Sequence, residues 1–245
     1  MPGSPVMAGY VIDEKTLHAR TSAGDTASVR LAVDASSGCE RLEQRVIRFA
    51  PGRSQERVLD GSRQELLYIA AGGGTLHVNG EPHGLEPDMG IYLVPGDRFS
   101  VDNRGPEELL VVSVTAPHEA SSDDAHGVTV RYADQPVLPA SPNREFRFLV
   151  DKDIGCRDVT QFVGLIPPGR AGMHSHVYDE VVYVIEGEGV LHIGDQDTPI
   201  GTGSCIHLPP LVEHCLENTG TNEMRVLGVF YPQGDPASRA YEQQS

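Results

Sequence analysis

The chain carries one residue pattern twice, with the second copy 115 positions after the first. A repeat of this length predicts two copies of one structural unit rather than a single larger domain. We therefore expect two domains, residues 1–125 and 126–245, with the small and acidic segment 119–126 (EASSDDAH) as the linker between them. The pairs that share this offset are Glu65 and Glu180, Tyr68 and Tyr183, Gly72 and Gly187, Gly74 and Gly189, Leu76 and Leu191, His77 and His192, Asn103 and Asn218, and Pro117 and Pro232.

Both halves consist of short apolar runs that end at glycine, proline or asparagine, which is typical of strands rather than helices. The chain has 27 glycines and 18 prolines, and Asn79–Gly80 is a strong hairpin signal. These patterns predict an all-β fold. The expected strands are residues 27–33, 44–49, 65–71, 75–78, 90–94 and 109–115 in the first half, and 128–132, 146–150 and a strand-rich block at 159–231 in the second.

Four side chains of the kind that bind metals lie close together in the second half. His174 and His176 are two positions apart, so both point to the same side of an extended strand. Glu180 follows across a short bend, and His214 arrives from a later strand. Three imidazoles and one carboxylate suit one divalent transition metal such as Mn, Fe, Co, Ni, Cu or Zn.

This segment resembles the cupins, whose two motifs are written G(X)5HXH(X)3–4E(X)6G and G(X)5PXG(X)2H(X)3N. Two positions differ: only four residues separate Gly169 from His174, and Leu211 stands in place of the inner glycine. The resemblance implies two tandem jelly-roll barrels, a bicupin, with His174, His176, Glu180 and His214 holding a metal ion in the second. The matching residues are Gly169, His174, His176, Glu180 and Gly187 in the first motif, and Gly203, Pro209, His214 and Asn218 in the second.

The first half keeps only one of the four ligands, Glu65, and its loop before that residue is two residues longer. A lone carboxylate does not hold a transition metal, so we expect a metal-free first barrel with a structural or dimerising role. We expect Glu65 to pair with Arg63 or Arg98 instead. The other three ligand positions are occupied by Leu59, Gly61, and Phe99 or Ser100.

Two residues of the motif are candidates for catalysis. Glu180 could shuttle a proton in addition to binding the ion, and Tyr178 could contact a metal-bound substrate. Packing within the turn is the alternative role for Tyr178. Gln161 and Arg147 would contact an anionic substrate if they point into the barrel, but a shift of one residue in register reverses the face they take.

Three further histidines have no partner at ligand spacing. His77 and His192 occupy matching positions in LHV and LHI, and we expect both to face outward and not to bind a metal. His207 precedes LPP, and its pattern leaves open whether it lines the pocket rim, the surface or the core.

Composition limits the class of partner and the compartment. The net charge of −16 disfavours nucleic acid and anionic membranes, so we expect a small-molecule substrate. The opening residues MPGSPVMAGYVIDEK show no secretory signal, and no apolar run has the length of a membrane span, so we expect a cytoplasmic protein. The resemblance to bicupins implies a homodimer. Four cysteines without a CxxC pair, expected to be free thiols, are Cys39, Cys156, Cys205 and Cys215.

The motif leaves three classes of function open. The ligand set resembles that of quercetinase-type dioxygenases, which implies oxygen-dependent chemistry on a small enolic or hydroxylated substrate. The same ion could act as a Lewis acid in an isomerase, cyclase or hydrolase, and the ureidoglycine aminohydrolases are bicupins of similar size. A metabolite-binding protein without catalysis is the third alternative.

Overall fold

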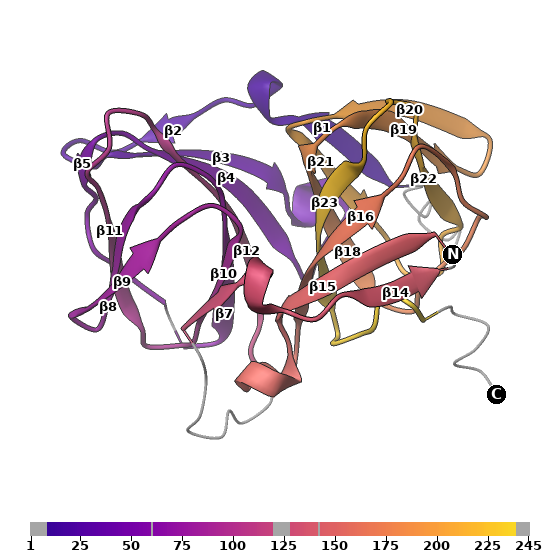
Figure 1. The fold of residues 1–245 in the computed structure, drawn as a ribbon. Helices are drawn as coiled ribbons and strands as arrows, with labels where there is room; N and C mark the ends of the chain where they lie inside the picture. The colour runs from indigo at the N-terminus through magenta and orange to yellow at the C-terminus, as the bar shows by residue number, and fades with distance from the viewer. Residues whose placement is uncertain (1–8, 60, 120–127, 142, 239–245) are drawn as a thin grey trace, which may run out of the picture.

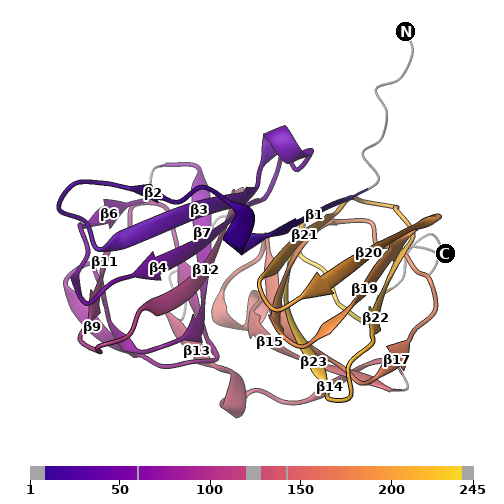
Figure 2. The same ribbon diagram turned by 90° about the horizontal axis from the view of Figure 1, so that it is seen from above.

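The computed structural model describes residues 9–59, 61–119, 128–141 and 143–238. These residues form two β-barrels that lie side by side (Figures 1 and 2). Each barrel consists of one seven-stranded and one smaller antiparallel sheet, so the prediction of an all-β fold with two tandem jelly-roll barrels is confirmed. The predicted linker lies almost entirely outside the described residues. The helical elements described are the 3-10 turns η1 (Glu14–Thr16), η2 (Ala35–Ser37), η3 (Tyr132–Asp134) and η4 (Lys152–Ile154).

The first barrel has a seven-stranded sheet in the order β13-β10-β7-β12-β4-β3-β2. Its second sheet has the order β5-β11-β8-β9, with β6 also paired to β11. The predicted Asn79–Gly80 hairpin joins β8 to β9, and both of its residues have positive φ. The bounds are β2 (Arg20–Thr21), β3 (Ala27–Val33), β4 (Glu43–Phe49), β5 (Gly52–Arg53), β6 (Arg57–Val58), β7 (Arg63–Ala71), β8 (Gly74–Val78), β9 (Glu81–Leu85), β10 (Met89–Leu93), β11 (Arg98–Asn103), β12 (Leu109–Pro117) and β13 (Thr129–Arg131).

The second barrel repeats this arrangement. Its sheets have the orders β1-β21-β18-β23-β16-β15-β14 and β17-β22-β19-β20. The bounds are β1 (Tyr10–Asp13), β14 (Leu138–Ser141), β15 (Arg144–Val150), β16 (Thr160–Ile166), β17 (Gly169–Arg170), β18 (Asp179–Glu186), β19 (Glu188–Ile193), β20 (Gln196–Gly201), β21 (Ser204–Leu208), β22 (His214–Asn218) and β23 (Met224–Tyr231).

Each repeat lends its first strand to the other barrel. Strand β1 pairs with β21 of the second barrel, and the two lie side by side in Figure 2. Strand β13 pairs with β10 of the first barrel. The strand predicted at 128–132 therefore completes the first barrel, although it lies in the second half of the sequence. The predicted boundary at residue 125 lies outside the described residues. The opening segment, predicted as an arm of the first barrel, pairs with the second.

Equivalent asparagines confirm the repeat in detail. The Asn103 amide donates to the backbone oxygens of Phe49 and Glu107, and the Asn218 amide donates to those of Ile166 and Asn222. All four distances lie between 2.7 and 2.8 Å. Each amide satisfies two backbone carbonyls at the turn into its last long strand, which explains why the duplicated asparagine is needed at that position.

The interior of the first barrel is filled with apolar side chains. Leu59 and Phe99, which stand at two of the ligand positions, are buried in its core cluster. The prediction that Glu65 pairs with Arg63 or Arg98 is wrong. Its carboxylate accepts a hydrogen bond from the Ser113 hydroxyl, because β7 and β12 are neighbours in the sheet and both side chains face inward. Burial raises the pKa of Glu65.

A separate apolar cluster joins the two barrels. It includes Leu66, Tyr68 and Val112 from the first barrel and Val181 and Leu227 from the second, all nearly inaccessible to solvent. Residues of β7 and β18 thus alternate between a barrel interior and the interface. Among the described residues, helices with the length and apolarity to cross a bilayer are absent.

Substitution of Gly90 tests this interface. A Cβ at Gly90 in β10 would lie 2.8 Å from both Gln161 Oε1 and Leu149 Cβ of the second barrel. We expect Gly90→Ala to lower the free energy of unfolding by about 1–3 kcal/mol, because a packed interface cannot accept the added methyl group. Chemical denaturation measures the change.

Gly84 in β9 is the matched control. A Cβ there meets nothing within 4 Å, so Gly84→Ala should change the free energy of unfolding by less than about 0.5 kcal/mol. Equal effects of the two substitutions would contradict the close packing of the barrels at Gly90.

Candidate metal centre

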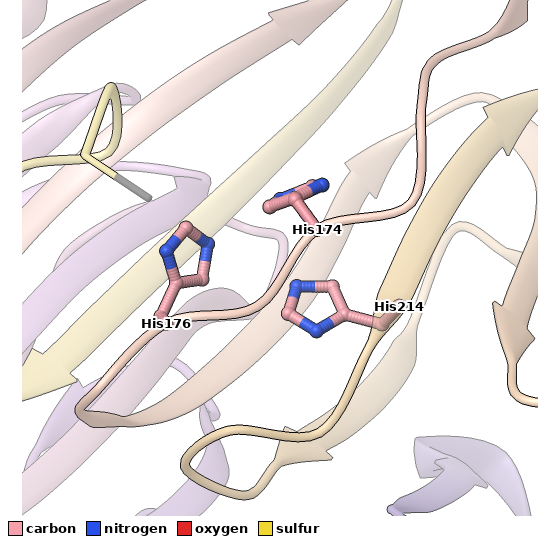
Figure 3. A group of neighbouring side chains, drawn as sticks. All are labelled: His174, His176 and His214. Atoms are coloured by element: carbon pink, nitrogen blue, oxygen red, sulfur yellow. The ribbon is translucent and has the colours of Figure 1, made fainter. Parts of the chain in front are cut away.

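Three histidines meet inside the second barrel. His174 and His176 lie on the segment that leads into β18, and His214 opens β22. The backbones of His174 and His214 form a reciprocal pair, with N–H···O distances of 3.0 and 2.8 Å. This pairing places the three rings around one space, as Figure 3 shows. One ring nitrogen from each residue lies within 4.8 Å of the others.

Backbone carbonyls fix the orientation of all three rings. Nδ1 of His174 lies 3.2 Å from Gly172 O, and Nδ1 of His214 lies 2.8 Å from Val212 O. Nδ1 of His176 lies 3.1 Å from Ser238 O. A carbonyl oxygen only accepts, so each Nδ1 carries the proton and each Nε2 keeps its lone pair. The three imidazoles are therefore in the tautomer that binds a metal through Nε2.

Glu180 lies next to this group, although the three histidines alone form the set whose ligand atoms all lie within 4.8 Å of one another. Strand β18 places it inside the barrel, where it is 6% exposed, with Oε2 3.9 Å from His176 Nε2. Two donors bound at about 2.0–2.2 Å to one ion can lie up to about 4.4 Å apart, so one ion is within reach of both. The donor set of three neutral nitrogens and one carboxylate fits a divalent transition metal.

Tyr178 packs behind the histidines instead of facing the cavity. Its ring stacks on His176 with centroids 4.9 Å apart, and its hydroxyl donates to Asp235 O at 2.8 Å. The hydroxyl also lies 3.1 Å from His176 Nδ1. The side chain is 2% exposed. This position corresponds to packing within the turn, the alternative role for Tyr178. A catalytic role for Tyr178 stays a prediction, and through these contacts it would act by way of His176.

A cavity of about 80 Å³ opens next to the four predicted ligands. Apolar side chains form most of its wall, and Arg144 is the basic residue among the described lining residues. Its Nη2 donates to Leu216 O at 2.5 Å. The remaining wall includes Phe146, Phe162, Ile166, Val182, Leu208, Leu216, Val226 and Phe230.

Arg144 and Glu145 are the charged residues of β15 that line the cavity, whereas Arg147 and Gln161 do not line it. Arg147 packs 4.5 Å over the Tyr132 ring and donates to three backbone carbonyls beside it. Gln161 is fully buried at the interface near Gly90. Neither side chain lines the cavity, so the condition under which either would contact a substrate there is not met. The sequence carried no signal for Arg144, because the face of a strand depends on its register.

Leu211, which replaces the motif glycine, keeps the backbone shape that glycine would provide. Its φ is +63°, and its N–H donates to His176 O at 2.7 Å. A left-handed conformation costs a non-glycine residue about 1–2 kcal/mol. The hydrogen bond ties the turn before His214 to the segment that carries His176, so the altered motif still positions both ligands.

The other histidines lie outside this centre. Leu191 and Ile193 belong to the barrel core, so His192 faces the outer side of its sheet, as expected, but it is only 4% exposed. Its ring nitrogens lie 2.6 Å from Asp197 Oδ1 and 2.8 Å from Glu217 Oε2. His77 is half-buried in the first barrel. His207 is buried on the side of β21 opposite to the metal cavity.

Comparison with known proteins identifies the family of this chain. The Cupin domain matches residues 45–115 and 162–230, one segment in each barrel, and together they make up more than half of the chain. The chain belongs to the cupin family. Both barrels are therefore cupin domains, and the centre just described occupies the second of them.

Curated relatives match about a quarter of this cupin chain. The oxalate-binding protein of Thermotoga maritima is 36% identical over 67 residues, which are 26% of this chain and 55% of that protein. An uncharacterized protein of Methanocaldococcus jannaschii is 29% identical over 70 residues, 28% of this chain and 56% of its own. The chain thus spans about half the length of the curated relatives it matches.

Solved structures share the whole two-barrel fold. Protein Ylba from E. coli has a TM-score of 0.80 at 13% identity and covers 94% of this chain and 93% of its own. The putative glyoxylate induced protein from Pseudomonas aeruginosa has a TM-score of 0.79 at 17% identity, with coverages of 96% and 94%. A Bacillus subtilis oxalate decarboxylase variant has a TM-score of 0.73 at 14% identity, with coverages of 91% and 77%. At such identities the likeness concerns the fold.

Loss of one ligand should empty this centre. We expect His214→Ala to lower the bound divalent metal more than tenfold, because changes even in the outer shell of metal sites cost about 10–100-fold in affinity. Elemental analysis of protein equilibrated with Mn²⁺ or Zn²⁺ measures the metal content. His18 is exposed, and His18→Ala should leave the content unchanged. Full metal retention in His214→Ala would contradict the assignment.

The hydroxyl of Tyr178 offers a second test. Tyr178→Phe keeps the ring on His176 but removes the hydrogen bond to Asp235 O and the contact with His176 Nδ1. We expect metal affinity to fall about 10-fold, as for other outer-shell partners, while substrate KM at metal saturation stays unchanged. A metal titration followed by steady-state kinetics separates the two effects. Unchanged metal affinity with a large loss of kcat would instead support direct catalysis by Tyr178.

Proposed function

We propose that the second cupin barrel is a metal-dependent enzyme for a small carboxylic acid, whose carboxylate is bound by Arg144. The observation that carries this proposal is the presence of one guanidinium and the His174, His176, His214 and Glu180 donor set in the same cavity. A guanidinium matches a carboxylate with two parallel hydrogen bonds, and it keeps its charge at every physiological pH.

The size of the cavity limits the substrate. A volume of about 80 Å³ holds only a few groups the size of a water molecule. This favours an acid of two or three carbons over a polycyclic substrate such as a flavonol. The names of two similar proteins, an oxalate-binding protein and an oxalate decarboxylase, support the same class. Oxalate and its close analogues are therefore the first substrates to test.

The residues of the cavity have distinct roles in this proposal. Apolar walls such as Phe162 and Phe230 exclude water and strengthen the electrostatic contacts of Arg144. In this proposal Glu180 accepts or returns a proton of the substrate. A divalent ion bound by the four ligands supplies Lewis acidity and, if it is redox-active, electron transfer.

The donor set is compatible with two reaction classes. Oxygen-dependent cleavage is the dioxygenase reaction that the ligand set implies by resemblance. The second candidate is non-oxidative cleavage, such as decarboxylation, in which the C–C bond breaks, neutral CO₂ leaves and the remaining carbon takes up a proton. The small apolar cavity favours this reaction because the net uptake of a proton removes one negative charge, which such walls disfavour. We expect the acid substrate in both cases.

Substitution of Arg144 tests the substrate class. Arg144→Ala should weaken oxalate binding to the metal-loaded protein about 10- to 100-fold, the loss typical of charge-assisted hydrogen bonds, and Arg144→Lys should restore part of it. Titration calorimetry measures affinity. Arg147→Ala is the matched control on the same strand and should leave affinity unchanged. Equal oxalate affinity in wild type and Arg144→Ala would contradict the proposal.

Turnover under controlled oxygen then separates the reaction classes. Stoichiometric oxygen uptake would identify oxygen-dependent cleavage, whereas CO₂ release at the same rate under anaerobic conditions would identify non-oxidative cleavage. Tight binding of oxalate and related acids without turnover, with any of the candidate metals, would contradict an enzymatic function and leave a binding protein.

A further inference from the structure

A second group of metal-binding side chains lies between the two barrels. Cys39 comes from the first repeat, and Asp179 and His207 come from β18 and β21 of the second. One ligand atom from each lies within 4.8 Å of the others. Asp179 and His207 point away from the metal cavity, because Glu180 and Leu208, their neighbours in sequence, line it.

The group is buried but incomplete. Cys39 and His207 are each 1% exposed. His207 Nε2 lies 2.9 Å from Asp179 Oδ1, whereas Nδ1 is buried and has no hydrogen-bond partner among the described residues. A buried polar atom left unpaired costs about 1–3 kcal/mol. An ion bound by the imidazole would account for a ring that the protein alone does not fully satisfy.

At the equivalent position in the other repeat, the three side chains satisfy one another by hydrogen bonds and need no bound ion. There Cys156, Gln64 and Tyr92 replace Cys39, Asp179 and His207. The Cys156 thiol lies 3.4 Å from Gln64 Oε1 and also forms a hydrogen bond with the side chain of Tyr92. The turns that carry the two cysteines match, since Gly38 and Gly155 have φ of 92° and 90°.

The two repeats therefore present the same cysteine in the same turn to two different environments. One consists of neutral side chains that satisfy one another. The other combines a thiol, an imidazole and a carboxylate, which are the three ligand types that zinc prefers. This difference between otherwise equivalent positions points to a ligand at Cys39.

We propose that Cys39, Asp179 and His207 bind a second divalent ion, of the zinc class, which ties the two barrels together. Binding replaces the thiol proton of Cys39, which leaves to solvent, and the thiolate and carboxylate then balance the charge of the ion. A neutral complex of this kind suits an apolar interface. The Asp179 side chain is 17% exposed and provides a route from solvent and room for a water ligand.

The protonation of the Cys39 thiol is consistent with a bound ion. Burial raises the pKa of Cys39 to about 12, while backbone hydrogen bonds from Leu42 and Arg41 act in the opposite direction. Cys39 is therefore protonated without an ion, and a reactive thiolate is not expected there. The same backbone donors are placed to stabilise sulfur once a metal has displaced the proton.

Cobalt substitution tests the proposal without interference from the other centre. Thiolate bound to Co²⁺ absorbs in the near ultraviolet by charge transfer, and the site of three histidines and one glutamate contains no sulfur ligand. We expect Co²⁺ titration of the His174→Ala protein to produce this absorption and to saturate at one ion per chain. In the same background, Zn²⁺ should raise the melting temperature.

Matched variants identify the ligands. Cys39→Ser and, independently, Asp179→Asn should weaken Co²⁺ binding at this site by more than about 100-fold, since even outer-shell changes at metal sites cost about 10–100-fold. Cys156→Ser, the equivalent cysteine, should leave the absorption unchanged. Size-exclusion chromatography checks that each variant is folded. Absence of thiolate-to-cobalt absorption in the folded His174→Ala protein, or its persistence in Cys39→Ser, would overturn the proposal.

Discussion

The alternation of side chains along β18 controls the chemistry of the second barrel. Successive residues of a strand face opposite sides of the sheet, so Glu180 faces the three histidines while Asp179 faces the first barrel. Strand β21 beside it repeats the division, with Leu208 in the cavity wall and His207 at the interface. One pair of strands therefore builds a polar centre inside the barrel and a polar group at the junction, with apolar layers on either side. A register shift of one residue would exchange the two and destroy both.

The two repeats share a backbone but have diverged in the interior. At the position of His214 the first barrel has Phe99, which packs into an apolar cluster with Leu59. The buried carboxyl of Glu65 keeps its place on the equivalent strand, yet it accepts a hydrogen bond from Ser113, and burial raises its pKa. Burial that raises the pKa of a carboxyl opposes metal binding, because ligation requires the anion. The first barrel thus keeps the fold of the second but lacks the imidazoles and the readily ionised carboxylate that a metal ion requires.

The sequence was sufficient to predict local features and insufficient for those that depend on register or distant pairing. The spacing of His174, His176, Glu180 and His214 predicted a shared centre, because each lies near a turn whose shape is local. The sequence left open whether Arg147 or Gln161 faces the cavity and gave no signal for Arg144, since nothing in the pattern of β15 fixed which face meets the cavity. The exchange of β1 and β13 was not foreseen for a similar reason: a strand at a sheet edge takes its partner from a segment about 200 residues away in one case and about 40 in the other.

The same distinction between local and distant contacts applies within the metal centre. The carbonyls that orient His174 and His214 belong to Gly172 and Val212, each two residues before its histidine. These rings take their metal-binding tautomer as soon as the turns form. The carbonyl that orients His176 belongs to Ser238, and Tyr178 holds the neighbouring Asp235 carbonyl. Two ligands are therefore prepared by the motif itself, whereas the third depends on the segment that follows β23. The affinity of the centre is then coupled to the docking of that segment, because an imidazole free to rotate or change tautomer binds an ion less well.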